Sequence, residues 1–376
     1  MQRNTILPRR DCKTTVEAQG LLFHTSDGTP YWDESAYYGF SMDEIDRIEA
    51  AANELQRLCL LAGDRIIEEG RFAEFAIPES AIAWIRETWE AEPPALYGRF
   101  DLAYDGLGPP KLLEYNADTP TSLLETAAIQ WHWLEDCFPR LDQFNSIHER
   151  LVDKWRDLAP SLRGKVYFAH LDHTEDVMTV TYLRDTAEQA GLKTDGILMA
   201  DIGWDPKLGA FVDLQGQRMD AIFKLYPWEW LIHEEFGQHA LASRRRTIWI
   251  EPIWKMLWSN KAILPLLWEM FPGHENLLEC YRDDPRGMNA YVRKPLLSRE
   301  GANVQIILPG ATWETGGEYG EEGYVYQAIG PVPSFEGQYP VLGAWMVDGV
   351  CAGMGIRESA QPITDNLSRF VPHVIA

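Results

Sequence analysis

Hydrophobic residues recur with helical spacing in the first part of the chain and with strand-like spacing in much of the remainder. Residues 41–70 carry an apolar stripe of helical period. Ser41 and Glu44 form a capping-box pattern at its start, and Gly70 closes it. The same spacing predicts further helices over residues 79–91 and 122–138.

The pattern changes to alternating strands and helices at about residue 164. Short apolar runs at residues 166–172, 193–200, 221–228 and 246–252 predict strands, and residues 175–191 predict a helix that ends at a glycine. Strand–helix alternation favours a parallel sheet with helical connections. We therefore expect an α/β subdomain over approximately residues 164–255.

The last third of the chain mixes one helix with several strands and turns. We expect a helix over residues 260–271, a strand at 291–296 and a loop at 297–307. The remaining apolar segments, residues 323–330, 339–347 and 351–358, predict strands. No linker-like or repeated segment separates these regions, so we expect residues 1–376 to form one unit with interleaved lobes.

The stretch from residue 97 to 118 holds the strongest candidate chemistry. Residues 99–104 and 111–117 predict two strands joined by a Gly/Pro-rich turn at 105–110. Because strand side chains alternate, Arg99 and Asp101 share one face, as do Glu114 and Asn116. Two carboxylates and an amide are suitable Mg²⁺ ligands, and an arginine beside them can stabilise a transferring phosphoryl group. The alternative is an exposed hairpin with a polar outer face.

Composition excludes several functional classes. The 34 basic and 57 acidic residues give a net charge of −23, which disfavours nucleic acid as a partner. The five cysteines are scattered without a CxxC pair, which argues against a disulfide framework or a zinc site and indicates a reducing, cytoplasmic location. We find no secretory signal and no apolar run long enough for a membrane span.

A series of motifs resembles the glutathionylspermidine synthase family, in particular its stand-alone synthetase-type members, the acid–amine ligases. The motifs are GRFD, LLEYNADTPTSLLE, EPIWK, SNKAILPLLW, VRKP and GIRES, followed by ITDN and SRFVPH. The resemblance implies an α/β fold of the ATP-grasp type with an associated parallel α/β subdomain. It also implies amide bond formation driven by ATP through an acyl phosphate, with two Mg²⁺ ions at Asp101, Glu114 and Asn116.

Two lysines are the cationic candidates for nucleotide phosphates. Lys294 lies in an apolar strand, and Lys261 lies where a helix is expected to open, whereas a solvated lysine is the ordinary alternative for each. A loop at residues 298–303 contains Gly301 and can form an anion-binding concavity. Gln327 can reach an adenine edge, although an edge-strand glutamine is equally plausible. The resemblance implies this ATP-binding set: Arg99, Phe100, Asp101, Lys261, Lys294, Gly301, Gln327, Ile363 and Thr364.

The acid substrate is expected next to the metal strand. By resemblance, the substrate-binding set comprises Thr119, Thr121, Glu175, Asp176 and Arg357. Ordinary first-turn helix acids are the alternative for Glu175 and Asp176. The chain departs from the family at Leu225, where glutathione-binding members carry a hydroxyl residue.

These observations predict an ATP- and Mg²⁺-dependent carboxylate–amine ligase with Arg99 as the catalytic residue. Approximately residues 256–376, together with 97–118, would form the nucleotide and metal site. Expected partners are an amine and a small carboxylate, with peptide-like acids included in that class. Two alternatives remain open: a non-catalytic or regulatory ATP-binding protein of the same fold, and a ligase that acts on a peptide or protein carboxylate.

Overall fold

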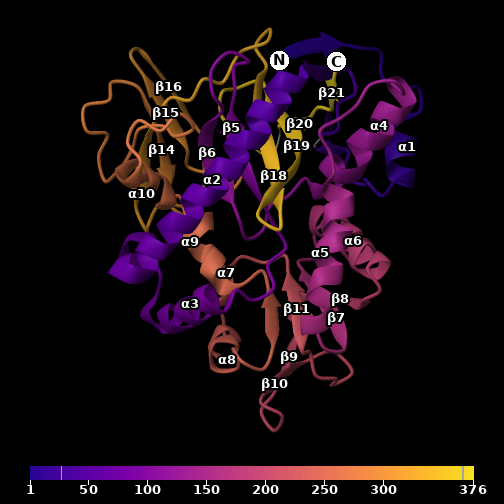
Figure 1. The fold of residues 1–376 in the computed structure, drawn as a ribbon, viewed down its shortest axis with the longest axis vertical. Coiled ribbons are helices and arrows are strands. Elements are labelled where there is room, and N and C mark those ends of the chain that lie inside the picture. The colour runs from indigo at the N-terminus through magenta and orange to yellow at the C-terminus, as the bar shows by residue number, and fades with distance from the viewer. Residues whose placement is uncertain (27, 366–367) are drawn as a thin grey trace.

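The computed structural model describes residues 1–26, 28–365 and 368–376. Its centre is a five-stranded antiparallel sheet in the order β20–β19–β18–β5–β6 (Figure 1). These strands are β5 (Tyr97–Ala103), β6 (Lys111–Asn116), β18 (Tyr339–Val347), β19 (Val350–Ser359) and β20 (Arg369–Phe370). Segments from the first third and the end of the chain therefore meet in one sheet.

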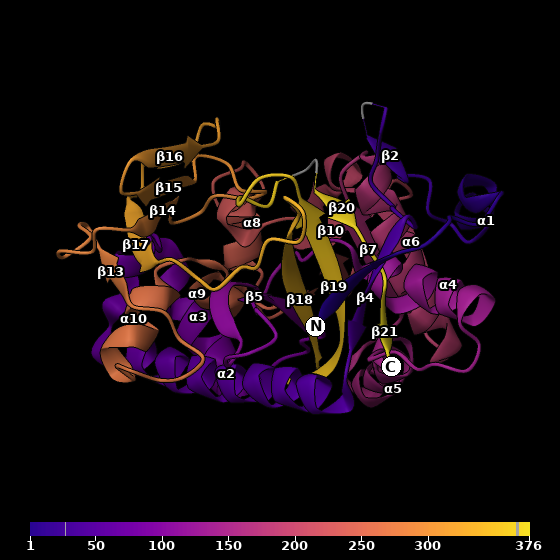
Figure 2. The ribbon, with the colours of Figure 1, turned by 90° about the horizontal axis from the view of Figure 1, so that it is seen from above.

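Helix α2 (Met42–Glu69) runs beneath the central sheet and packs against β18 and β19 (Figure 2). The Ser41 hydroxyl accepts from the Glu44 N–H and the Glu44 carboxylate accepts from the Ser41 N–H, which confirms the predicted capping box. Gly70 ends the helix at a φ of 69°, a left-handed conformation that favours glycine. Buried positions three and four residues apart along α2 face a hydrophobic core shared with β5, β6 and the C-terminal strands.

A four-stranded parallel sheet in the order β12–β11–β7–β8 lies beside this core. It comprises β7 (Lys165–His170), β8 (Lys193–Leu198), β11 (Ala221–Lys224) and β12 (Ile248–Ile250). The expected parallel arrangement of these segments is therefore present. The accompanying helices are α5 (Ile147–Leu158), α6 (Thr174–Gln189), α7 (Trp228–Leu231) and α8 (Gly237–Ala242), and β9 (Gly203–Asp205) pairs with β10 (Ala210–Val212).

A second antiparallel sheet lies on the other side of β6, in the order β13–β17–β14–β15–β16. Its strands are β13 (Cys280–Arg282), β14 (Tyr291–Pro295), β15 (Gln305–Leu308), β16 (Ala311–Glu314) and β17 (Tyr324–Ala328). The expected loop at 297–307 was too long, because residues 305–308 pair with β14 and β16. Ile306 is buried in a small cluster there, so β-branched side chains extend the sheet into the predicted loop.

The termini close a three-stranded sheet of β1 (Gln2–Thr5), β4 (Ala36–Phe40) and β21 (His373–Ile375) (Figure 2). Helix α3 (Glu79–Ala91) is present as expected, whereas the predicted helix at 122–138 begins with a π-helical turn, η2 (Glu125–Ile129), before α4 (Gln130–Cys137). The remaining elements are α1 (Cys12–Ala18), β2 (Thr25–Ser26), β3 (Thr29–Pro30), α9 (Met256–Ser259), α10 (Ile263–Met270) and the short 3₁₀ turns η1 (Arg71–Phe75), η3 (Ala159–Ser161), η4 (Met199–Asp201) and η5 (Ile253–Lys255).

Candidate active site

The β5–β6 hairpin brings the four predicted polar side chains together. Arg99 pairs in register with Asn116, and Asp101 with Glu114. Arg99 Nε lies 2.7 Å from Asp101 Oδ1, and Asn116 Nδ2 donates to Asp101 Oδ2 at 3.1 Å and to Glu114 Oε1 at 3.3 Å. Gly343 on β18 makes room for the arginine, because a Cβ there would lie 2.8 Å from Arg99 Cδ. Arg99, the two acids and the amide therefore form one hydrogen-bonded cluster.

Two lysines from outside the hairpin converge on the same cluster. Lys261 precedes α10 and lies 3.1 Å from Glu114 Oε2, while donating to the Ser298 carbonyl at 2.6 Å. Lys294 on β14 donates to the Leu113 carbonyl at 2.8 Å and is only 7 % exposed. The helix α10 begins at Ile263, so Lys261 stands just before the helix rather than inside its first turn.

Gln327 makes a contact that differs from the expected one. Its side-chain oxygen accepts from Lys294 at 2.8 Å and its amide donates to the Leu112 carbonyl at 2.9 Å. Because both ends of the amide are occupied and the residue is buried on β17, Gln327 holds the lysine against β6. These contacts turn the Gln327 amide toward Lys294 and Leu112, and the adenine-edge contact expected for Gln327 stays a prediction.

A cavity of about 330 Å³ opens beside the cluster. Asp101, Glu114, Lys261 and Lys294 contribute its charged groups. Apolar walls come mainly from the second antiparallel sheet, namely Val292, Val304, Ile306, Leu308 and Trp313, together with Ile329, Val332, Val341 and Ile363. Its size and its mixture of apolar walls with a few charged groups match a small-molecule pocket.

The predicted glycine loop forms part of this cavity. Gly301 has a φ of 68°, and a Cβ at this position would lie 2.4 Å from the Thr364 carbonyl oxygen. Glycine therefore lets the loop approach residues Ile363 and Thr364, and all three line the cavity as the ATP-binding set requires. Phe100 differs, because its ring is fully buried and stacks on Tyr115 on the opposite face of the hairpin, with ring centroids 3.8 Å apart.

The charges of this site shift the pKa values of its members. Burial alone would raise the pKa of Glu114, but the neighbouring Lys261 and Lys294 charges lower it to about 2. Burial raises the pKa of Asp101, against the opposing effect of Arg99. Burial lowers the pKa of Lys294 to about 8, against the opposing effect of Glu114. The site thus holds opposite charges in a poorly solvated place, which suits a ligand that carries charges of its own.

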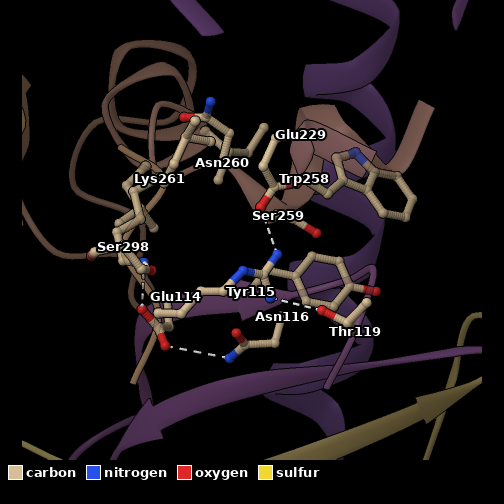
Figure 3. A pocket seen from close by; sticks show the side chains of 14 residues that line it. Glu114, Tyr115, Asn116, Thr119, Glu229, Trp258, Ser259, Asn260, Lys261 and Ser298 are labelled. Atoms are coloured by element: carbon tan, nitrogen blue, oxygen red, sulfur yellow. Dashed lines mark hydrogen bonds and ion pairs between the residues drawn. The ribbon is translucent and has the colours of Figure 1, made fainter. Parts of the chain in front are cut away.

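A smaller cavity adjoins the cluster on the side of the expected acid substrate. Figure 3 shows Glu114, Asn116, Thr119, Glu229 and Lys261 around it. The Thr119 hydroxyl accepts from Arg299 Nη1 at 2.7 Å, and Arg299 Nη2 lies 2.6 Å from Glu229 Oε1. The loop that carries Gly301 is thereby tied to the segment after β6 and to α7.

Sequence reasoning missed Arg299 and Glu229. Arg299 lies in the predicted anion-binding loop at residues 298–303, and this position in the sequence could have marked it as a candidate site residue. No feature of the sequence marks Glu229, because its contact with Arg299 joins residues 70 positions apart in sequence.

The remaining substrate candidates lie on the other side of Arg99. Arg357 on β19 lines a cavity of about 20 Å³ together with Arg99 and Asp101. Burial raises the pKa of Glu175 at the start of α6, and the Arg357 charge opposes that rise. Asp176 instead accepts from the Leu171 N–H at 3.3 Å. Arg357 thus lies close to the cluster and to Glu175, whereas Asp176 binds the backbone of the segment before α6.

The glutathionylspermidine synthase preATP-grasp family profile matches residues 3–376. The chain belongs to this family. It is 42 % identical over 368 residues to the "Putative acid–amine ligase" of Haemophilus influenzae, covering 93 % of this chain and 92 % of that protein. Family membership confirms the expected relationship and the enzyme class, an acid–amine ligase.

Two further proteins are similar to this family member. Trypanothione synthetase of Crithidia fasciculata is 31 % identical over 337 residues, covering 81 % of this chain and 51 % of that protein, so the chain spans about half of that relative's length. The crystal structure titled "Putative gamma-glutamylcysteine synthetase" from Methylobacillus flagellatus matches with a TM-score of 0.48 and 10 % identity, over 84 % of this chain and 87 % of that one.

Two features of the described residues limit the chemistry of this family member. Within residues 1–26, 28–365 and 368–376, no three His, Cys, Asp or Glu side chains gather as a metal-binding group. The cluster supplies two carboxylates and one amide, so a cation there would need further ligands from substrate or water. No helix in the described part of the chain is long and apolar enough to cross a membrane.

Proposed function

We propose that this chain is an ATP-grasp-type ligase that uses ATP and Mg²⁺ to join a carboxylate to an amine through an acyl phosphate. The observation that carries the proposal is one cavity of about 330 Å³ lined by Asp101, Glu114, Lys261 and Lys294, with Arg99 hydrogen-bonded to Asp101. Acid–amine ligase names among its relatives support the same reaction class. Residues of approximately 256–376 and 97–118 would form the nucleotide and metal site, and approximately 164–255 the parallel α/β subdomain.

The donor set fits Mg²⁺. Asp101 and Glu114 face each other across the hairpin, and the Asn116 amide bridges them at 3.1 and 3.3 Å. The two carboxylates supply hard oxygen ligands, and Asn116 would add its amide oxygen in place of the Nδ2 that donates to them here. Such a small oxygen set is typical of sites where Mg²⁺ is shared with phosphates. Two Mg²⁺ ions bound there would offset the charge of the ATP β- and γ-phosphates.

The protein's own groups would act on the reactants as follows. Lys261 and Lys294 would bind the triphosphate, while the loop at Gly301 covers it. The apolar walls around Ile306 and Trp313 would enclose the base. A substrate carboxylate held near Thr119 would then attack the γ-phosphate, and Arg99 would stabilise the charge on the transferring group.

The acid substrate would lie on the side of Thr119, Thr121 and Arg357. Thr119 is already held by Arg299, so its hydroxyl is oriented before substrate arrives. Thr121 contributes a backbone carbonyl that accepts from Arg99 Nη1, which fixes the catalytic guanidinium. Glu175 and Arg357 carry opposite charges and could hold the two ends of a zwitterionic or peptide-like acid.

A phosphate-release screen tests the proposal. Purified protein is incubated with Mg²⁺ and ATP against pools of small carboxylates and amines, and released phosphate is measured. We expect release that requires one carboxylate and one amine together, and that disappears in Glu114→Gln. Tight ATP binding without release in any pool would favour a non-catalytic ATP-binding protein. Release that requires only peptides with a free C-terminal carboxylate would favour the peptide ligase instead.

A further inference from the structure

A cavity of about 690 Å³ lies outside the candidate active site, and the proposed reaction does not use it. Helices α2 and α3 line one side of it and α5 lines another (Figure 1). This cavity, the rear groove, is lined among others by Gln56, Leu60, Asp64, Trp89, Glu92 and Tyr115. Tyr115 lies on the face of β6 opposite to Glu114 and Asn116, because side chains alternate along a strand. The rear groove is therefore behind the hairpin that carries the proposed metal ligands.

One stripe of α2 runs along the rear groove. Gln56, Leu60 and Asp64 all line the groove and stand four residues apart, so they share one face of the helix. Eight residues of α-helix span about 12 Å. The stripe begins with an amide, continues with an apolar side chain that is 45 % exposed, and ends with a carboxylate. The rear groove therefore suits a linear molecule with different chemical groups at its two ends.

The Asp64 end of the rear groove is acidic. The Asp64 carboxylate accepts from Trp89 Nε1 at 2.9 Å, which orients it beside the indole ring. Glu92 follows three residues after Trp89, directly after the last residue of α3, and lines the same groove. Lys255 also lines the groove, but it is paired with the buried Glu251. The two carboxylates at this end therefore attract a cation.

The C-terminus of α3 adds to this negative field. The last carbonyls of a helix carry partial negative charge, which a glycine cap or a basic side chain commonly satisfies. Helix α3 has no basic residue in its last turn, its cap residue Glu92 has a φ of 43°, and Pro93 and Pro94 have no N–H to donate. Among the described residues, no N–H or side chain from outside the helix donates to the carbonyls of residues 88–91. A cationic group of a ligand would satisfy them.

Tryptophan rings form the apolar middle of the rear groove. Trp89, Trp254 and Trp258 pack edge to face, with ring centroids 5.3 Å apart for Trp89 and Trp254 and 4.5 Å apart for Trp254 and Trp258. Trp254 belongs to the EPIWK motif, to which the proposed reaction assigns no role. Indole rings stabilise methylene groups by contact and also attract a nearby cation. This wall therefore favours an aliphatic chain that ends in an ammonium group.

The Gln56 end of the rear groove offers a hydrogen-bond donor. Gln56 is 8 % exposed, and its Oε1 accepts from the Tyr115 hydroxyl at 2.9 Å. Its Nε2 carries two N–H donors and has no partner among the described residues. Gly349 lines the groove beside it, where a Cβ would lie 3.9 Å from that nitrogen. Lys154 and Asp348 at this end form an ion pair and so offset each other. A neutral acceptor such as an amide carbonyl therefore fits here.

Two aromatic residues connect the rear groove to the active site. Tyr115 and Trp258 line both the rear groove and the smaller cavity beside Thr119 (Figure 3). Their rings stack with centroids 5.6 Å apart. Tyr115 stands between Glu114 and Asn116 on β6, so a displacement of its ring acts on the backbone that carries two of the proposed metal ligands.

We propose that the rear groove is an effector site for a linear aliphatic molecule with an ammonium group at one end and an amide carbonyl at the other, such as a monoacylated diamine. The ammonium group binds between Asp64, Glu92 and the C-terminus of α3. The methylene chain lies along Leu60 and the tryptophan wall, and the carbonyl accepts from Gln56 Nε2. The occupant acts on the active site through the shared aromatic wall. A ligase that acylates one end of a diamine forms such a molecule, so this regulatory part rests on the proposed function.

Titration calorimetry in the absence of ATP and Mg²⁺ tests the binding site. The probe is N-acetyl-1,6-diaminohexane. Two control ligands each lack one end group: 1,6-diaminohexane has no carbonyl, and N-hexylacetamide has no ammonium group. We expect the probe to bind once per chain and each control ligand to bind about tenfold more weakly or worse. No binding of the probe, or equal binding of either control ligand, would overturn the proposal.

Matched variants locate the bound probe. Leu60→Arg places a cation in the rear groove and should abolish binding, whereas Leu61→Arg makes the same exchange at an exposed neighbour outside the groove and should bind like the parent. Asp64→Asn keeps an acceptor for Trp89 and should weaken binding about threefold or more, because one charge is removed. Asp46→Asn, at an exposed position of α2 outside the groove, should bind like the parent. Equal effects within either pair would overturn the location.

The effector role is tested by the affinity for a non-hydrolysable ATP analogue in the presence of Mg²⁺. We expect a saturating concentration of the probe to change the Kd of the analogue about fivefold or more in the parent, and to leave it unchanged in Leu60→Arg. An unchanged Kd in the parent would overturn the effector role. Absence of phosphate release in every substrate pool would instead refute the ligase function, because the calorimetry of the rear groove needs no turnover.

Discussion

Lys261 and Glu114 form an ion pair of 3.1 Å that joins a candidate phosphate ligand to a candidate metal ligand. The two residues come from different parts of the chain, Glu114 from β6 and Lys261 from the segment before α10. Binding of Mg²⁺ and ATP would replace this contact by a carboxylate–metal contact and a lysine–phosphate contact. Metal and nucleotide should therefore bind cooperatively. Mg²⁺ at Glu114 alone would leave Lys261 without its ion-pair partner, and phosphate at Lys261 alone would leave Glu114 without one, whereas the two ligands together pair both charges.

Removal of either metal carboxylate should abolish Mg²⁺-dependent ATP turnover. Asp101→Asn and Glu114→Gln are the suitable exchanges, because each keeps the side-chain shape and one acceptor oxygen, whereas alanine at position 101 would leave the buried Arg99 with no acceptor there. We expect losses of about 100-fold or more in phosphate release, with circular dichroism and thermal unfolding close to those of the parent. Parent-like turnover in both variants would refute the metal assignment.

Substitutions of two cationic residues of the site should affect ATP affinity and kcat differently. Lys294→Met should mainly weaken ATP affinity, because its charge contacts phosphate in the ground state and the transition state alike. Arg99→Met should mainly lower kcat, because the charge that it stabilises grows during transfer. Titration calorimetry with a non-hydrolysable ATP analogue, beside steady-state kinetics, measures both. Equal loss of affinity in the two variants would remove the distinction.

ATP binding should become weaker between pH 7 and 9. Burial lowers the pKa of Lys294 to about 8, and a bound phosphate would raise it again. The complex therefore holds more protons than the free protein in this range, so binding takes up protons and affinity falls as pH rises. Calorimetry in two buffers of different ionisation enthalpy measures the uptake at pH 8, and Lys294→Met should remove it.

The core of the candidate site could be predicted because it lies within one hairpin. Alternation along two short strands suffices to place Arg99, Asp101, Glu114 and Asn116 on one face, and the structure shows them in contact. The capping box at Ser41 is equally local.

Contacts between distant segments could not be predicted in the same way. The amide of Gln327 is used by Lys294, and Arg299 reaches Glu229, because strands and loops far apart in sequence pack together. Sequence spacing has no information on such pairs. The strand at 305–308 was missed for a related reason, since its pairing partners lie in β14 and β16.

A buried ion pair between Asp118 and Lys224 should anchor the hairpin to the parallel sheet. Lys224 Nζ lies 2.7 Å from Asp118 Oδ1, and both side chains are at most 1 % exposed. Asp118→Asn or Lys224→Met leaves one charge buried without its partner, so each should lower the free energy of unfolding by about 3–5 kcal/mol. Urea unfolding measures the loss. The double variant should lose less than the sum, because it buries no lone charge; additive losses would show that the pair is not coupled.

Glutathione with spermidine should be a poor substrate pair for this protein. Leu225 stands where glutathione-binding relatives are expected to carry a hydroxyl, and its side chain is 4 % exposed, so it offers no polar contact. A site that hydrogen-bonds a group discriminates strongly, whereas an apolar wall discriminates by only about 1–3 kcal/mol. We expect a different acid, with an apolar portion on the side of Leu225, to be preferred, and Leu225→Thr to improve glutathione use over the parent. Product formation is followed by mass spectrometry at matched concentrations. Efficient synthesis of glutathionylspermidine by the parent protein would contradict this expectation, because the missing hydroxyl would then be dispensable.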